Sequence, residues 1–183
     1  MKVIGLIGGL SWESTAHYYT AINRETAQRR GGLHSAPMLI ESVDFAPIAE
    51  MQTRGAWDEA GDVLAKSAAR LGDSGAEVLA IASNTMHIAA DQVAAASTAT
   101  FVHIADPTAA ALAEDGVETV GLLGTRFTLE MPFYRDRLAA AGLNVLVPEV
   151  DVTNLNGIIF EELCRGIVRD PSRQTYVAAI SRL

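Results

Sequence analysis

The chain has 183 residues, of which 49% are hydrophobic, so it can bury the core of one ordinary domain or of two small lobes. Its formal net charge of −8 argues against nucleic acid and anionic membrane surfaces as partners, because both attract clusters of lysine and arginine. No apolar run approaches the roughly 18 residues that a membrane-spanning helix needs. The single cysteine, Cys164, excludes an internal disulfide and a multi-cysteine zinc site, and we expect a reducing cytoplasm as the location.

Short apolar runs alternate with longer segments of helical periodicity along the whole chain. We expect strands at residues 3–7, 38–42, 78–81, 101–104, 119–123 and 144–147. We expect helices at residues 14–30, 58–72, 86–96, 107–114, 129–141, 154–168 and 172–183. Strands that are apolar throughout and separated by helices indicate parallel sheets covered on both faces, so the predicted class is α/β.

A short internal repeat favours two related lobes. Residues 4–8, Ile-Gly-Leu-Ile-Gly, recur as residues 120–124, Val-Gly-Leu-Leu-Gly, and the same offset pairs Tyr18 with Tyr134. Each copy reads as a strand, a glycine turn and a helix. Any parallel strand followed by a glycine turn has a similar pattern, so a single domain stays the alternative. We place the lobes at residues 1–104 and 105–183.

Three polar turns follow predicted strands, where the binding crevice of an open α/β sheet lies. They are residues 8–15, which include Ser11 and Trp12, residues 83–85 and residues 124–128, which include Thr125. The second turn, Ser83-Asn84-Thr85, places three short polar side chains at a predicted helix N-terminus, where free N–H groups and the helix dipole favour an anion. The alternative is that these side chains are ordinary helix caps.

Other reactive side chains give weaker signals. His87 could be a base or a metal ligand, but no second ligand lies nearby at metal spacing, so we expect it to cap or pack within its helix. The remaining histidines are isolated and read as structural: His17, His34 and His103. Cys164 lies in an apolar helix and reads as a buried thiol. Of the adjacent pair Glu161 and Glu162, one could reach a cleft, and we take Glu161 as the candidate.

Taken together, these motifs resemble the aspartate/glutamate racemase family. The resemblance spans the whole chain. The matching stretches are residues 5–15, 18–19, 22–23, 31–36, 42–45, 84–87, 103–106, 122–125 and 158–163.

The resemblance implies a racemase that works without a cofactor. Two flavodoxin-like α/β lobes then face each other across a cleft, commonly within a homodimer. One acid/base residue from each lobe flanks the substrate's α-carbon, and both are usually cysteines. The first of these precedes an Asn-Thr pair, and the second lies in a Gly-Cys-Thr-Glu-like turn near the C-terminus.

The sequence departs from that pattern in two places. The residue before Asn84-Thr85 is Ser83, and a hydroxyl is a far weaker base than a thiol unless a neighbour activates it. The chain also ends at Leu183, within a predicted helix, before the expected last strand and the second acid/base turn. We therefore expect an incomplete second lobe and a protein that continues, with a genuine short form as the alternative.

The expected function is racemisation of aspartate or glutamate, with Ser83 as the base or proton relay on one face of the substrate. Asn84, Thr85 and Thr125 are the expected donors to the α-carboxylate, since preorganised donors stabilise the charge that develops there. Ser11 and Gln52 are candidates for contacts to the substrate's side-chain carboxylate or for the rim around it, and Trp12 and Glu161 are further candidates. No metal or cofactor is expected. The alternatives are a related dicarboxylate decarboxylase or cis–trans isomerase, and a dicarboxylate-binding protein without turnover.

Overall fold

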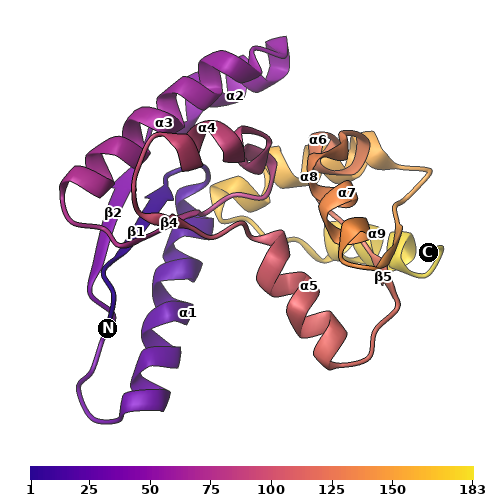
Figure 1. Ribbon diagram of the computed structural model, residues 1–183. Coiled ribbons are helices and arrows are strands. Elements are labelled where there is room, and N and C mark those ends of the chain that lie inside the picture. Colours follow the sequence, from indigo (N-terminus) through magenta and orange to yellow (C-terminus); the bar gives the residue numbers. More distant parts are fainter. The chain divides into compact units, whose positions relative to one another are not determined.

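A computed structural model describes residues 1–183, and contacts between Cα atoms divide the chain into two compact units. The first unit comprises residues 1–103 and the second comprises residues 104–183 (Figure 1). Both units combine parallel strands with flanking helices, which confirms the predicted α/β class. None of the helices combines the length and the apolar character needed to cross a membrane.

The first unit holds a four-stranded parallel sheet in the order β2-β1-β3-β4. Its strands are β1 (Ile4–Gly8), β2 (Met38–Ser42), β3 (Val78–Ile81) and β4 (Thr100–Phe101). Its helices are α1 (Trp12–Arg30), α2 (Phe45–Arg54), α3 (Trp57–Asp73), the 3-10 helix η1 (Thr85–Ala89) and α4 (Ala90–Ala95).

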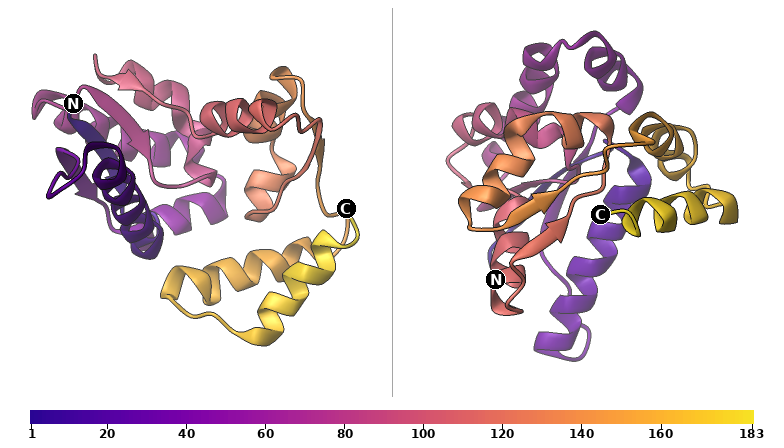
Figure 2. Two further views of the ribbon diagram at one scale, coloured as in Figure 1. Left: turned by 90° about the horizontal axis from the view of Figure 1, so that it is seen from below. Right: turned by 90° about the vertical axis from the view of Figure 1, so that its right-hand side faces the viewer.

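Helices cover both faces of this sheet. A Cβ atom on Gly5 would meet Leu71 of α3, whereas one on Gly8 would meet Thr15 of α1. Because positions an odd number apart on a strand point to opposite faces, α1 and α3 lie on opposite sides of the sheet (Figure 1; Figure 2, left). Helix α3 buries its apolar face in the main core. The buried core residues of α3 and the strands include Ala60, Leu64, Ala68, Leu71, Ile7, Leu79 and Ile81.

A polar cluster joins the edge strand β2 to α3. The Glu41 carboxylate accepts hydrogen bonds from Arg70 and, at 2.7 Å, from the Ser67 hydroxyl. The hydrogen bond from Arg70 lowers the pKa of Glu41. Beyond β2, the Val43 N–H donates to the Gly8 carbonyl at 3.0 Å, so the ends of β1 and β2 stay together where polar residues gather.

The helix α2 was missing from the sequence prediction. Asp44 caps it by accepting from the Ala46 N–H at 3.2 Å, and Pro47 lies in its first turn, where proline is tolerated. A buried glutamine, Gln52, occupies a core-facing position in this helix. The polar residue interrupts the apolar periodicity, which is why the pattern failed to indicate a helix.

The second unit contains a two-stranded parallel sheet of β5 (Thr119–Gly121) and β6 (Asn144–Leu146). Its helices are α5 (Ala105–Glu114), α6 (Arg126–Glu130), α7 (Pro132–Ala140), α8 (Val152–Glu161), the 3-10 helix η2 (Leu163–Arg165) and α9 (Asp170–Ile180). A small core forms among Ala105, Ala109, Tyr134, Leu138 and Leu143. The Tyr176 hydroxyl of α9 donates to the Leu155 carbonyl of α8 at 3.0 Å, and burial raises the pKa of Tyr176 to about 12.

Two long predicted helices of this unit are each divided. The helix expected at residues 129–141 breaks at Met131, because Pro132 forces the residue before it into an extended conformation (φ −90°, ψ 147°). The helix expected at residues 154–168 ends at Glu161 and continues as a short 3-10 turn. Gly166 then adopts a left-handed conformation that stops it.

Candidate functional site

The turn between β1 and α1 is held closed by one threonine. The Thr15 hydroxyl accepts from the Gly9 N–H at 2.8 Å and lies 3.2 Å from the Ser11 carbonyl, to which it donates. Gly9 has a φ of +82°, and a Cβ atom there would lie 2.1 Å from the Val43 carbonyl oxygen. Only glycine fits such a position. The sequence therefore builds this turn from a required glycine and a buried hydroxyl.

Ser11, a predicted site residue, has an unusual backbone. Its φ of 144° lies in a region that residues with a side chain avoid, and such strain concentrates at functional sites. The side chain is buried and caps α1 by accepting from the Ser14 N–H at 3.4 Å. Beside it, Trp12 begins α1 with 61% of its surface exposed. An exposed indole next to a strained turn is well placed to contact a ligand.

Replacing Thr15 with valine should loosen this turn. Valine keeps the shape of threonine but leaves the buried Gly9 N–H without its acceptor, which costs about 1–3 kcal/mol of unfolding free energy. Urea unfolding would measure the change, with Thr15→Ser expected to retain most of the stability. Thr20→Val removes an exposed hydroxyl from the same helix and serves as the control. Equal stability of the Thr15→Val and Thr20→Val variants would show that the Thr15 hydrogen bonds do not hold the turn.

The second turn begins where β3 ends, next to β1 in the sheet. Ile7 pairs with Ile81, and the Ala82 N–H donates to the Ile7 carbonyl at 2.8 Å, so the Ser11 and Ser83 turns leave neighbouring strands at the same edge. The Ser83 hydroxyl accepts from the Met86 N–H at 3.4 Å. Since a hydroxyl has one proton and two lone pairs, this bond leaves the proton available for donation.

The other predicted residues of this turn differ in exposure. The Asn84 side chain is exposed, and Thr85 is buried at the start of η1. The α-helix expected from residue 86 is instead the 3-10 helix η1 followed by the short α4. Two of its first N–H groups are already bonded, that of Met86 to Ser83 and that of His87 to the Asn84 carbonyl. The expectation that a helix N-terminus binds an anion here stays a prediction, with fewer free N–H groups than a regular α-helix would offer.

Gln52 is joined to the same turn from α2. Its side chain is only 2% exposed, and its Nε2 group donates to the sulfur of Met86 at 3.2 Å. Its Oε1 atom is buried and has no hydrogen-bond partner in the protein. A buried polar atom without a partner costs about 1–3 kcal/mol, so it needs an explanation, and a ligand that donates a hydrogen bond supplies one. The amide oxygen is an acceptor and suits an ammonium group, whereas the expected role of Gln52 toward a carboxylate would use its NH2 group and stays a prediction.

The predicted residues of the second unit lie in two places. Thr125 is the N-cap of α6, where its hydroxyl accepts from the Thr128 N–H at 3.3 Å. Thr128 also fills the space next to Gly124, much as Thr15 does next to Gly8 in the first unit. Glu161 is exposed at the end of α8. Its neighbour Glu162 is the carboxylate held in place, by Arg169 at 3.2 Å and Ser172 at 2.8 Å.

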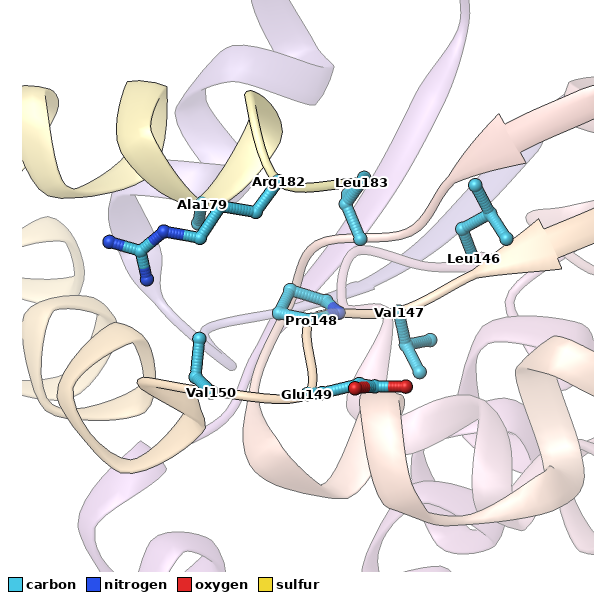
Figure 3. Close-up of a pocket in the computed structure, with 8 residues that line it drawn as sticks. All are labelled: Leu146, Val147, Pro148, Glu149, Val150, Ala179, Arg182 and Leu183. Carbon is cyan, nitrogen blue, oxygen red and sulfur yellow. The ribbon is translucent and has the colours of Figure 1, made fainter.

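The second unit also has a cavity of about 380 Å³, lined mainly by residues 146–150 and by Arg182 and Leu183 (Figure 3). Its arginine pairs with Asp151 at 2.8 Å. None of the predicted site residues lines it, and the buried polar atom without a partner belongs to Gln52 of the first unit. The candidate site therefore lies in the first unit, at the carboxyl ends of the neighbouring strands β1 and β3.

The sequence pattern left His103 isolated, yet its ring packs against that of His87 in the turn after β3. Their ring centroids are 4.5 Å apart, and both side chains are buried. The sequence offered one indication of this pair. His87 lies in the segment after β3 and His103 in the segment after β4, and these two strands are neighbours in the sheet.

Parallel sheets with polar, strained turns at the carboxyl ends of their strands define an open α/β protein of the kind that binds small ligands there. The chain belongs to the Asp/Glu/hydantoin racemase family, whose sequence profile matches residues 7–183. This membership confirms the resemblance seen in the sequence.

Solved structures of similar proteins agree with this assignment. A provisional Asp/Glu racemase from Yersinia pestis shares 45% identity, with a TM-score of 0.88 over 100% of this chain and 80% of that chain. An aspartate racemase homologue from Pyrococcus horikoshii OT3 shares 36% identity, with a TM-score of 0.75 over 91% of this chain and 74% of that chain. The aspartate racemase of Picrophilus torridus, at 19% identity, has a TM-score of 0.77 over 99% of this chain and 75% of that chain and supports the fold alone.

Proposed function

We propose that this protein racemises an acidic amino acid, aspartate or glutamate, without pyridoxal phosphate. Membership of the racemase family supports the reaction class. The location of the substrate site is supported by the Gln52 Oε1 atom, which has no hydrogen-bond partner and lies beside the Ser83-Asn84-Thr85 turn. A buried acceptor next to exposed and half-buried donors matches a ligand that carries both an ammonium group and a carboxylate.

In this proposal each side chain of the first unit has a separate task. Gln52 Oε1 accepts a hydrogen bond from the substrate's ammonium group and so fixes the rotation of the α-carbon. Asn84 and Thr85 donate to the α-carboxylate, where negative charge develops as the α-proton leaves. Ser11 and Trp12 form the rim next to the substrate's side chain. Ser83 accepts or relays the α-proton on one face of the substrate.

Racemisation also needs a second acid/base group on the opposite face of the α-carbon, because inversion requires a proton to return there. The protein is further proposed to act as a cytoplasmic homodimer, as the family resemblance implies. Thr125 of the second unit and Glu161 remain candidates, and a variant of Thr125 is described below.

A dicarboxylate-binding protein without turnover is the second candidate, because the residue in the proton-transfer position is a serine. The Ser83 hydroxyl is a weak base at neutral pH, and the partner shown for it is a backbone N–H, which does not raise its basicity. A related dicarboxylate decarboxylase or cis–trans isomerase stays a further alternative, since protonating a carbanion from one face needs only one acid.

A chiral assay tests the proposal. Purified protein, freed of pyridoxal phosphate by dialysis, is incubated separately with L-aspartate, L-glutamate and both D-enantiomers, and the enantiomers are separated by chromatography. Approach to a 1:1 mixture from either side supports a racemase. A rise in melting temperature with these ligands, but no conversion, would favour the binding protein, since binding to the native state alone raises stability.

Two alanine variants probe the carboxylate donors. Asn84→Ala should weaken binding by about 1–3 kcal/mol, the effect of removing a hydrogen-bond partner from a charged group, and Thr125→Ala should do the same if the candidate Thr125 also donates to the carboxylate. Calorimetry with racemic aspartate avoids heat from turnover. Thr125→Ser should restore binding, and Thr53→Ala, at an exposed position of α2, is the control. Unchanged affinity in both alanine variants would remove these residues from the carboxylate site.

A further inference from the structure

The carbonyl group of Ser83 has an unusual hydrogen-bond partner. His87 Nδ1 lies 2.6 Å from the Ser83 carbonyl oxygen, four residues earlier in the chain. Because a carbonyl oxygen only accepts, the hydrogen must lie on Nδ1. His87 Nδ1 is therefore protonated and donates to the Ser83 carbonyl.

This contact replaces a backbone hydrogen bond that a regular helix would make. The His87 N–H donates to the Asn84 carbonyl at 3.1 Å instead of reaching back four residues to Ser83. The Met86 N–H is turned toward the Ser83 hydroxyl. The Ser83 carbonyl would lose its helical partner in such a tight turn, and the imidazole of His87 supplies one.

The imidazole is itself fixed by a buried group of rings. His87 and His103 are 2% and 3% exposed and meet edge to face, with an angle of 64° between the rings. Phe101 of β4 packs against both, with centroids 6.0 Å from His87 and 6.4 Å from His103. Because rings packed in this way restrict rotation, the donor Nδ1 stays aimed at Ser83. No cluster of three potential metal ligands forms here.

We propose that His87 is a positioning residue, which sets the Ser83 hydroxyl by holding the Ser83 carbonyl. The Ser83 backbone carries the side chain that faces the substrate, so rotation of that peptide would swing the hydroxyl away from the α-carbon. Misplacement of a reacting group by about 1 Å can slow a reaction on the order of 100-fold. The effect of His87 on the reaction rests on the proposed racemase function. The contact between His87 and the Ser83 carbonyl does not depend on that function.

Two variants distinguish the role of Nδ1 of His87 from that of Nε2. Asparagine can place an amide N–H close to the position of Nδ1, whereas glutamine places its amide near the position of Nε2. His87→Asn should therefore keep the rate of α-proton exchange within about threefold of wild type. His87→Gln and His87→Leu should lower kcat by roughly 10–100-fold with little change in KM, since substrate binding does not use His87. Equal losses in the asparagine and glutamine variants, or no loss in the leucine variant, would overturn the proposal.

Nuclear magnetic resonance tests the contact without relying on activity. In full-length wild-type protein labelled with ¹⁵N and ¹³C, His87 should show a protonated Nδ1 and a coupling across the hydrogen bond to the Ser83 carbonyl. An unprotonated Nδ1, or no coupling, would show that His87 does not hold the Ser83 carbonyl. Wild-type protein that shows this contact but exchanges no α-proton would refute the racemase function and leave the positioning of Ser83 standing.

Discussion

Replacing Ser83 with alanine is expected to lower the rate of α-proton exchange by about 10²–10⁴-fold, the usual contribution of a positioned acid or base. The hydroxyl is removed, while the turn keeps the backbone bond from the His87 N–H to the Asn84 carbonyl and the bond from His87 Nδ1 to the Ser83 carbonyl. The loss of the bond from the Met86 N–H should lower stability by only about 1 kcal/mol. Exchange followed by NMR and unfolding followed by circular dichroism measure the two effects.

A cysteine at the same position should act in the opposite direction. Ser83→Cys is expected to raise the exchange rate above wild type, because a few per cent of an ordinary thiol is ionised at pH 7 and the thiolate is the stronger base. Ser97→Ala is the matched control, since the Ser97 hydroxyl accepts a backbone N–H at 3.2 Å in a turn away from the site. If both Ser83 variants exchange at the wild-type rate, Ser83 does not stand beside the α-carbon.

Replacing Gln52 with methionine should stabilise the ligand-free protein and weaken ligand binding at the same time. The change keeps the length of the side chain and removes a buried oxygen that has no partner. Relief of that desolvation should raise the free energy of unfolding by about 1–2 kcal/mol, or Tm by roughly 2–8 °C. Loss of the acceptor for the ammonium group should weaken the affinity for racemic aspartate by about 1–3 kcal/mol.

These opposite changes distinguish a ligand-binding oxygen from a packing defect. Gln92→Met alters a half-buried glutamine of α4 in the same unit and should leave the affinity unchanged. If Gln52→Met lowers both stability and affinity, the Gln52 amide is a structural group. If stability rises and affinity is unchanged, Oε1 does not meet the ligand.

Strand positions could be predicted from the sequence because they depend on local apolar runs. The strands at residues 38–42 and 78–81 coincide with β2 and β3. Helix α2 was missed because the core position of Gln52 is polar, and the break at Met131 was missed although Pro132 could have indicated it. The type of helix after Ser83 was also wrong, because side-chain bonds, including that from His87, compete there with the backbone pattern.

The candidate site was only partly predictable. The turns with Ser11 and Ser83 could be found because polar residues follow apolar strands, and β1 and β3 do pair in the sheet. The partnerless oxygen of Gln52 and the packing of His103 on His87 depend on contacts between segments distant in sequence. No local pattern encodes those contacts, so their roles emerged only from the fold.

Exchange of the α-proton in D₂O tests the central claim most directly. L-aspartate and L-glutamate are incubated with the wild-type protein, the α-proton signal is followed by NMR, and the enantiomers are separated in parallel. The proposed function predicts loss of the α-proton signal together with formation of the D-enantiomer, and a much slower loss with Ser83→Ala. Unchanged α-proton signals for both amino acids, under conditions where they raise the melting temperature, would contradict it.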